Sequence, residues 1–226
     1  MKHNEKELNG LKEEVGLMWE LVISQLEKAK AALLGSDVAL AREIVSREKR
    51  VDAFEIKIDS DCENYIALYN PVAIDLRLVL SLIKLSITLE RIGDFCEGIA
   101  RHVADEECNE MGSKLAETLQ IGHMFDVLLG MLKGSYEAFE GETTEGCGEI
   151  LRMDDEVDKV YRSSLDIIGE YIRKQPDLTN CGLRLVLLVR KLERIGDHCS
   201  NIVEEIVFYV DAKVLKHGGG VHQGGK

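Results

Sequence analysis

The feature that most constrains the fold of this chain is an internal repeat. The segment Leu-Glu-Arg-Ile-Gly-Asp occupies residues 89–94 and returns letter for letter at residues 192–197. A cysteine follows each copy at the same distance, Cys96 in the first and Cys199 in the second. An identity of this length at one fixed offset indicates that a structural unit has been duplicated within the chain.

A second, weaker match lies upstream of each copy of this segment. Glu48 and Asp52 stand four residues apart, and Asp154 and Asp158 stand at the same spacing in the second half. The two motifs recur in the same order in both halves, and a glycine-rich segment follows them. We predict two tandem units and a disordered tail, over residues 1–105, 106–212 and 213–226.

Helix-breaking residues are sparse, which indicates long helices. The 226 residues include only two prolines, and aromatic residues make up 5%, a composition that does not suit a β-sandwich or barrel. The breaks that exist lie at Gly35-Ser36-Asp37, Asn70-Pro71 and Pro176, with polar segments between. We predict an all-α fold of six long helices in two pseudo-symmetric three-helix bundles, with helices at 5–34, 37–69, 72–104, 113–140, 144–174 and 177–212.

Apolar residues in the third predicted helix recur at alternating spacings of three and four, which predicts one buried stripe. The sixth helix repeats this pattern, and Cys96 and Cys199 fall on the stripe. With no paired Cys-x-x-Cys motif, we expect all six cysteines to be reduced thiols. A weaker stripe in the second helix comprises Leu40, Ile44, Val51, Phe54, Ile58, Tyr65 and Leu68.

Charge and hydropathy exclude two classes of partner. The formal net charge is −13, and no cluster of basic residues is visible in the sequence, so a nucleic-acid-binding surface is not expected. The most apolar segment, residues 72–92, is interrupted by charged residues, and the first residues contain no apolar signal segment. We therefore expect a cytoplasmic protein without a transmembrane segment.

Two acidic residues of the repeated motif share one helical face. With Leu89 in the core, Glu90 and Asp94 lie one turn apart on the side turned away from it. Like charges at this spacing repel each other. The glycine between them, Gly93 in the first copy and Gly196 in the second, disfavours a helix by about 1 kcal/mol relative to alanine. We therefore expect each glycine to admit a neighbouring helix or a ligand.

The second predicted helix carries a matching acidic stripe, Glu48, Asp52, Glu55 and Asp59. If it runs antiparallel to the third helix, Glu48 and Asp52 can meet the acidic pair of the repeated motif. Clustered carboxylates suit hard or borderline cations, so we predict divalent or trivalent metal ions, iron or zinc first and manganese or magnesium as alternatives. The predicted ligands are Glu48, Asp52, Glu90 and Asp94 in the first unit, and Asp154, Asp158, Glu193 and Asp197 in the second.

No catalytic arrangement accompanies these carboxylates, so we do not expect an enzyme. The sequence contains no glycine-rich phosphate loop and no nucleophile elbow. A metal-storage or oxidase bundle would need Glu-x-x-His motifs, which are absent. A coiled-coil adaptor that binds no metal is a further alternative. His198 follows Asp197 but is turned about 100° from it on a helix, which makes it a weak candidate ligand.

The sequence resembles the PhoU family of bacterial phosphate-transport accessory proteins. The resemblance rests on the doubled Glu-Arg-Ile-Gly-Asp motif, on Asn-Pro-Val-Ala-Ile-Asp-Leu-Arg at residues 70–77, and on Gly-Asp-His-Cys-Ser-Asn-Ile at 196–202. It implies two three-helix bundles, commonly dimeric, that bind metal clusters through the eight acidic residues named above. Asp154 replaces the longer Glu48 and Gly98 stands opposite Asn201, so the two sites are expected to differ.

The resemblance also implies a function that no residue pattern shows. It implies a negative regulator of phosphate uptake and of the phosphate-starvation response. The expected partners are a phosphate ABC transporter and a membrane sensor histidine kinase, together with a second copy of the chain. An accessory protein of a different, non-ABC phosphate transporter is the closest alternative.

Overall fold

The computed structural model describes residues 2–105 and 113–212, apart from the side chains of residues 2, 3, 48, 113 and 114. Within these residues the chain is helical and contains no strand, so the predicted all-α class is confirmed. The predicted tail at 213–226 lies outside the described residues, as does the junction at 106–112 between the two predicted units. The unit boundaries therefore stay a prediction.

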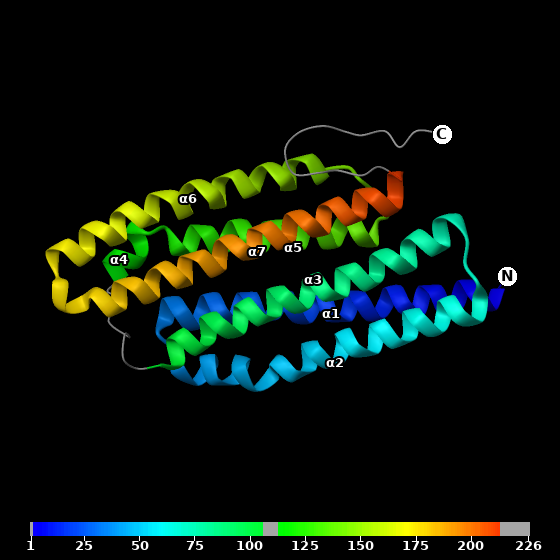
Figure 1. The fold of residues 1–226 in the computed structure, drawn as a ribbon, viewed down its shortest axis with the longest axis horizontal. Helices are drawn as coiled ribbons and strands as arrows, with labels where there is room; N and C mark the ends of the chain where they lie inside the picture. Colours follow the sequence, from blue (N-terminus) through cyan, green and yellow to red (C-terminus); the bar gives the residue numbers. More distant parts are fainter. Residues whose placement is uncertain (1, 106–112, 213–226) are drawn as a thin grey trace.

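Five of the six predicted helices are present as single long helices, and the fourth is divided in two. A short 3-10 helix, η2, also precedes the last long helix. The elements in chain order are α1 (Lys2–Gly35), α2 (Val38–Tyr69), α3 (Ala73–Ala104), α4 (Ser113–Thr118), α5 (Ile121–Glu140), α6 (Cys147–Lys174), η2 (Pro176–Leu178) and α7 (Thr179–Asp211), as Figure 1 shows.

The predicted helix at 113–140 is interrupted at Gln120, which takes a left-handed conformation with φ of 53°. Its two neighbours in sequence, Leu119 and Ile121, are both buried. Side chains two apart on a continuous helix point in nearly opposite directions and cannot both enter one core. The left-handed residue changes the direction of the backbone, so that both side chains can be buried. The spacing of apolar residues in the sequence does not predict such a change.

The other helix ends follow local sequence signals. The side chain of Asp37 accepts a hydrogen bond from the backbone amide of Leu40 at 2.9 Å and so caps the start of α2. Asn70 ends α2 in a left-handed conformation, directly before Pro71. The predicted breaks at both positions are therefore confirmed.

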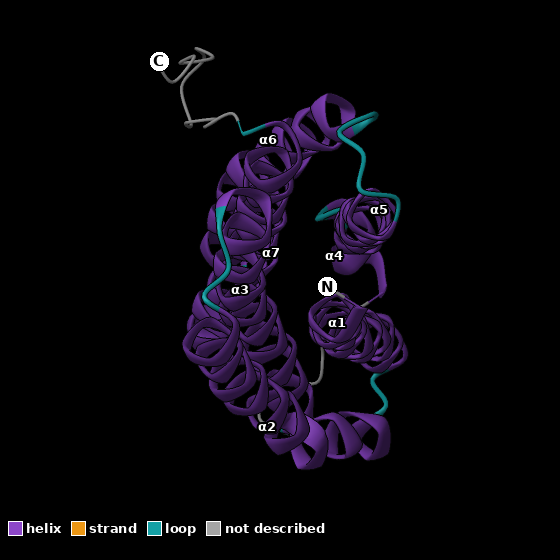
Figure 2. Cartoon of the chain, turned by 90° about the vertical axis from the view of Figure 1, so that its right-hand side faces the viewer, coloured by secondary structure: helices purple, strands orange, loops and turns teal. Residues whose placement is uncertain are grey.

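The helices form two bundles that share a curved layer. Helices α1, α2 and α3 pack together, as do α5, α6 and α7. Figure 2 shows α6, α7, α3 and α2 side by side in an arc, with α1 and α5 on its concave side. The bundles meet where α3 packs on α7 and where α1 packs on α5. The tandem three-helix arrangement is thus as predicted, and α3 and α7 occupy the centre of the layer.

The predicted core stripes are confirmed on α3 and on most of α7. Leu89, Ile92 and Cys96 are fully buried, as are their counterparts Leu192, Ile195 and Cys199. The stripe on α2 is confirmed in part, because Leu68 is 76% exposed. Cys62 instead fills the core between Ile58 and Tyr65.

The cysteines divide into two groups. Those at positions 62, 96, 147 and 199 are free and buried, where they act as small apolar side chains. Cys181 is disulfide-bonded, so the expectation that every cysteine is reduced is wrong for this residue. Cys108 lies outside the described residues.

No helix in the described part of the chain combines the length and apolar character that a membrane crossing requires.

Candidate functional site

The first copy of the repeated motif lies against α2, and its glycine makes that contact possible. A Cβ atom on Gly93 would lie 3.2 Å from Cγ1 of Val51 and 3.3 Å from Oε1 of Gln25. A side chain larger than that of alanine at this position would push α2 away from α3. Since Val51 directly precedes Asp52, the close approach brings the acidic stripe of α2 to the motif. The expectation that this glycine admits a neighbouring helix is met.

The approach of α2 covers a residue that was expected to face solvent. The side chain of Glu90 is only 17% exposed, whereas that of Asp94 is 39% exposed. The heptad position of a residue shows whether it faces the core of its own helix pair. It does not show whether a third helix covers that residue. The outward orientation expected for Glu90 is therefore wrong.

Four acidic residues form what we call the first carboxylate cluster: Asp52, Glu55, Glu90 and Asp94. Burial raises the pKa of Glu90 to about 7, and the charges of the other three add to this shift. The pKa of Asp94 is raised mainly by burial, while Arg91 and a hydrogen bond from Glu90 act in the opposite direction. Burial and neighbouring aspartates also raise the pKa of Glu55. Glu90 therefore titrates near neutral pH, chiefly because it is buried.

Arg91 makes two cationic contacts to this cluster, and both are long. Its Nε lies 3.6 Å from Oε2 of Glu90, and its Nη1 lies 3.6 Å from Oδ2 of Asp94. The arginine side chain is 58% exposed, so solvent screens much of its effect.

The chemistry of the first cluster fits a cation, but the described side chains do not form a finished coordination shell. Carboxylates with raised pKa values are oxygen donors that a divalent or trivalent ion would deprotonate and bind. Among the side chains that the structure describes, no three acidic, histidine or cysteine groups are grouped closely enough to hold an ion. Glu48 lies on α2, but its side chain is outside that set.

Glu55 is the member of the cluster that was absent from the predicted ligands. It follows Asp52 by three residues, which places both on one face of α2. The acidic stripe of the second predicted helix already included Glu55, so the sequence did contain a signal for this residue. The second repeat offers no guide, because Tyr161 occupies the equivalent position on α6.

The second carboxylate cluster comprises Asp154, Asp158, Glu193 and Asp197, and its geometry differs. Asp154 turns toward α7, where its Oδ2 accepts a hydrogen bond of 2.8 Å from Oγ of Ser200. Its Oδ1 lies only 2.5 Å from where a Cβ atom on Gly196 would be. The second glycine therefore admits a carboxylate, whereas the first admits an apolar side chain and an amide.

Arginines compensate much of the charge in the second cluster. Arg194 donates to Asp197 at 2.8 Å, and Arg162 donates to Asp158 at 2.6 Å. The pKa of Glu193 is nevertheless raised, chiefly by burial and then by Asp197, and its buried Oε2 has no hydrogen-bond partner among the described residues. The two clusters therefore share a motif but differ in how arginines contact their carboxylates.

His198 packs against α3. Its ring packs on that of Phe95 with centroids 5.6 Å apart, at the contact between α3 and α7. Burial, followed by Arg194, lowers its pKa, so this histidine favours the neutral form.

The raised pKa of Glu90 predicts a pH-dependent stability. The folded state binds the proton more tightly than the unfolded state, whose pKa is 4.5, so folding is progressively disfavoured as pH rises from about 4.5 to about 7. Glu90→Gln removes this penalty. In the presence of a chelator, we expect the variant to exceed the wild type in free energy of unfolding by about 1 kcal/mol above pH 7, and by much less at pH 4.5.

Urea unfolding at several pH values measures this difference. Glu63→Gln, which changes an exposed glutamate on the same helix as Asp52, is the control and should show no such trend. A constant offset of Glu90→Gln across the pH range would contradict the assignment.

Comparison with known proteins gives one consistent result. The family model described as the PhoU domain matches residues 15–103 and again residues 121–206, one match in each bundle. A relative from Escherichia coli, named phosphate-specific transport system accessory protein PhoU, is 31% identical over 214 residues, covering 95% of this chain and 88% of the relative. A homologue of that protein from Pseudomonas putida is 30% identical over 213 residues, covering 94% and 82%.

Solved structures agree with these matches. The crystal structure of PhoU from Pseudomonas aeruginosa superposes with a TM-score of 0.86 at 29% identity, covering 92% of this chain and 99% of that one. The phosphate transport system regulatory protein PhoU from Streptococcus pneumoniae gives a TM-score of 0.84 at 27% identity, covering 94% and 99%.

Proposed function

Because this chain belongs to the PhoU family, we propose that it is a regulator of phosphate uptake rather than an enzyme. The observation that carries the proposal is the match of that family's domain to both bundles, with relatives named for the phosphate-specific transport system along nearly the whole chain. In this proposal the protein acts on the cytoplasmic side, as a homodimer. It restrains a phosphate ABC transporter and couples it to a membrane sensor histidine kinase.

The architecture supports action through docking. In the described residues no helix is suited to cross a membrane, so the regulator would reach membrane partners by surface contact. The carboxylate clusters lie on α2, α3, α6 and α7, the four helices that form the curved layer in Figure 2. A change in the charge of this surface would alter its complementarity to a partner.

We further propose that the clusters hold metal ions, iron or zinc first, with manganese or magnesium as alternatives. Glu48, Asp52, Glu90 and Asp94 would hold one site, and Asp154, Asp158, Glu193 and Asp197 the other. Bound cations would neutralise the carboxylates and supply open positions for water or an anion. The raised pKa values of Glu90 and Glu193 support this assignment, because burial and neighbouring carboxylates disfavour the charged form of both groups, and a bound cation would offset that cost.

The metal proposal predicts that Asp94→Ala with Asp197→Ala loses bound metal while retaining the fold. Elemental analysis of protein purified without a metal-affinity column measures the metal-to-protein ratio. We expect the wild type to contain stoichiometric metal and the double variant to lose most of it. Glu63→Ala with Asp155→Ala removes two exposed acidic residues outside the clusters and should retain the wild-type ratio. Equal metal content in all three proteins would contradict the proposal.

Deletion of the gene in its native host tests the regulatory role. We expect a phosphate-starvation reporter that is normally silent at high phosphate to become active, and phosphate uptake to increase. Complementation with the wild-type chain should restore repression. An unchanged reporter and unchanged uptake in the deletion strain would overturn the proposed function.

A further inference from the structure

A glutamine in the core of the first bundle has an unpaired amide oxygen. Gln25 lies on α1, close in sequence to the fully buried Val22 and Leu26, and is itself only 3% exposed. Its Oε1 is buried and accepts no hydrogen bond from any residue that the structure describes. A buried amide oxygen in this state has lost its hydrogen bonds to water and gained none in return, so it lowers the stability of the fold.

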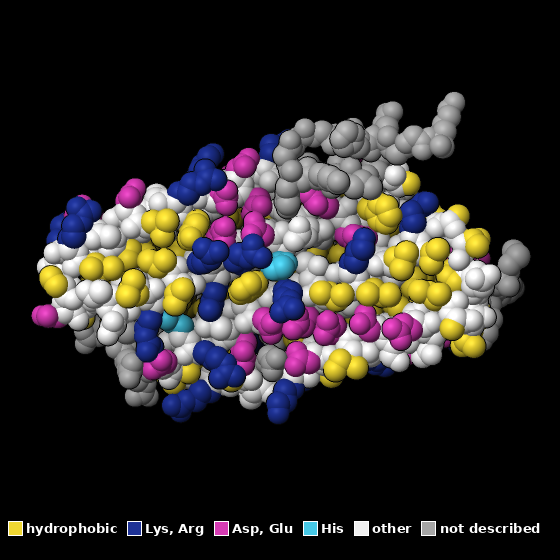
Figure 3. All heavy atoms as spheres, viewed as in Figure 1, with side chains coloured by type: hydrophobic (Ala, Val, Ile, Leu, Met, Phe, Trp, Pro, Cys, Tyr) yellow, Lys and Arg dark blue, Asp and Glu magenta, His cyan; other side chains and the backbone are white. Residues whose placement is uncertain are grey.

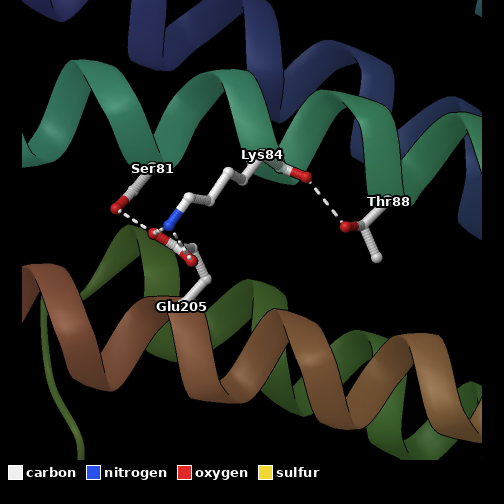
Figure 4. Close-up of polar contacts among 4 residues, drawn as sticks. All are labelled: Ser81, Lys84, Thr88 and Glu205. Carbon is white, nitrogen blue, oxygen red and sulfur yellow. Dashed lines mark hydrogen bonds and ion pairs between the residues drawn. The ribbon is translucent and has the colours of Figure 1, made fainter. Parts of the chain in front are cut away.

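The other buried polar residues in the described part of the chain are all paired. They are five serines, and each donates a hydrogen bond of between 2.6 and 2.8 Å: Ser81, Ser86, Ser135, Ser164 and Ser200. Figure 4 shows one of these bonds, from Oγ of Ser81 on α3 to Glu205 on α7. Folded proteins pair nearly all their buried polar groups, so Gln25 is an exception that needs an explanation.

The amide oxygen of Gln25 faces the first copy of the repeated motif. A Cβ atom on Gly93 would lie 3.3 Å from this oxygen. Gly93 follows Glu90 by three residues, so both lie on the same face of α3. The missing side chain of Gly93 thus lets the amide approach the helix where the first carboxylate cluster forms. Figure 3 shows the outer side of this region as a band of acidic side chains over α2 and α3.

The second repeat contains leucine at the equivalent position. Leu128 follows Gln25 by 103 residues, which is the offset of the repeated motif, and it is fully buried. A Cβ atom on Gly196 would lie 3.5 Å from its Cδ2, so Leu128 has the same place in the second bundle that Gln25 has in the first. The core of such a bundle therefore accommodates leucine at this position, and packing alone does not require an amide.

We propose that Gln25 supplies a neutral oxygen donor to a cation held at the first carboxylate cluster. This inference rests on the metal-binding role proposed above for that cluster. Amide carbonyl oxygens, like carboxylates, are ligands of hard cations. The acidic, histidine and cysteine side chains that the structure describes do not complete a coordination shell, so a donor of another residue type meets a need of the site. A bound cation would in turn satisfy the unpaired amide oxygen.

The second motif glycine meets an oxygen of a different kind. Oδ1 of Asp154 lies against Gly196, while its Oδ2 accepts the hydrogen bond of 2.8 Å from Ser200. The first motif glycine thus faces a neutral oxygen from α1, and the second faces a carboxylate oxygen from α6. Because no glutamine takes the place of Leu128, a loss of Gln25 should affect cation binding at the first cluster only.

Calorimetric titration of the metal-free full chain with Mn²⁺ and with Zn²⁺ tests the proposal. The background is Asp197→Ala, which removes a proposed ligand of the second cluster. In that background Gln25→Leu introduces the residue of the second bundle and should weaken binding by about 10–100-fold. Gln25→Glu retains an oxygen donor and should bind more tightly than Gln25→Leu. The control Leu26→Met changes a buried neighbour on α1 without removing an oxygen, and its affinity should match that of the background.

Urea unfolding in the presence of a chelator separates this role from a structural one. Gln25→Leu removes the unpaired buried amide, so its midpoint should lie at a higher urea concentration than that of the background. Damage to the fold would lower the midpoint and the metal affinity together. A rise in stability combined with a loss of affinity is the expected signature of a residue retained for binding.

The possible failures can be told apart. Addition of Asp94→Ala to the background should abolish the titration, which assigns the measured binding to the first cluster. Unchanged affinity in Gln25→Leu, alongside that loss, would overturn the role of Gln25 and leave the metal proposal intact. A lower urea midpoint for Gln25→Leu would likewise count against it. No binding of either ion by the wild type would overturn the metal proposal and this inference together.

Discussion

Replacement of Trp19 by alanine is expected to lower the free energy of unfolding by about 3–5 kcal/mol, the largest single effect we foresee. Trp19 is the sole tryptophan of the chain and is fully buried. Its Nε1 donates a hydrogen bond of 3.1 Å to the carbonyl oxygen of Leu132 on α5. The variant therefore loses both apolar burial and a hydrogen bond between the two bundles.

The aromatic contacts of Trp19 extend this link. Its ring centroid lies 5.3 Å from that of Phe139 on α5, whose ring in turn contacts Tyr209 on α7 at 6.3 Å. The hydroxyl of Tyr209 also donates to the carbonyl oxygen of Phe139 at 3.2 Å. One aromatic chain thus joins α1, α5 and α7, and its removal at Trp19 affects both bundles.

Urea unfolding followed by circular dichroism measures the loss in Trp19→Ala. Leu17→Ala is the control, because Leu17 lies on the same helix but is 55% exposed, and a change within about 0.5 kcal/mol is expected. Trp19→Phe keeps most of the apolar surface and should fall between the two. A loss below about 1.5 kcal/mol in Trp19→Ala would show that the α1–α5 contact contributes little to stability.

The second large effect distinguishes the two copies of one motif. Gly196→Ala is expected to lower the free energy of unfolding by about 1–3 kcal/mol, whereas Gly93→Ala should stay within about 1 kcal/mol of the wild type. In the second copy the new Cβ atom would lie 2.5 Å from Oδ1 of Asp154. In the first copy it would lie 3.2 Å from Val51, a contact that small shifts relieve.

A second substitution tests the cause of this difference. The Asp154 carboxylate must move in Gly196→Ala, which breaks its hydrogen bond with Ser200. Gly196→Ala combined with Asp154→Ala removes the overlap and should recover at least half of the lost stability. Equal effects of Gly93→Ala and Gly196→Ala, or no recovery in the double variant, would contradict this account. Thermal and urea unfolding of the four proteins provide the comparison.

Some of the candidate site could be predicted from sequence because its signals are local. Asp52 and Glu55 share a face of α2 by their spacing, and Glu90 and Asp94 share a face of α3. The antiparallel arrangement of neighbouring helices then brings Asp52 to the repeated motif, as expected. The burial of Glu90 could not be predicted in this way, because it depends on how closely α2 approaches at Gly93.

The amino-acid sequence by itself determined the all-α class, the duplication, the core stripes of α3 and α7, and the ends of α2. These features arise from the spacing of apolar residues and from helix capping. Both depend on residues that are close together in the sequence. The near-absence of proline allowed the helices to run to about 30 residues. The duplicated motif then required two bundles of the same kind.

Only the tertiary structure decided how identical sequences acquire different properties. Both copies of the motif read Glu-Arg-Ile-Gly-Asp, yet Arg162 joins the second cluster from α6, whereas Ile56 occupies the equivalent position on α2. One surface pocket between α3 and α7 is likewise lined by Arg101 and Lys191, which lie about 90 residues apart in sequence. Electrostatic energies depend on distance in space and on burial, and a helical period specifies neither.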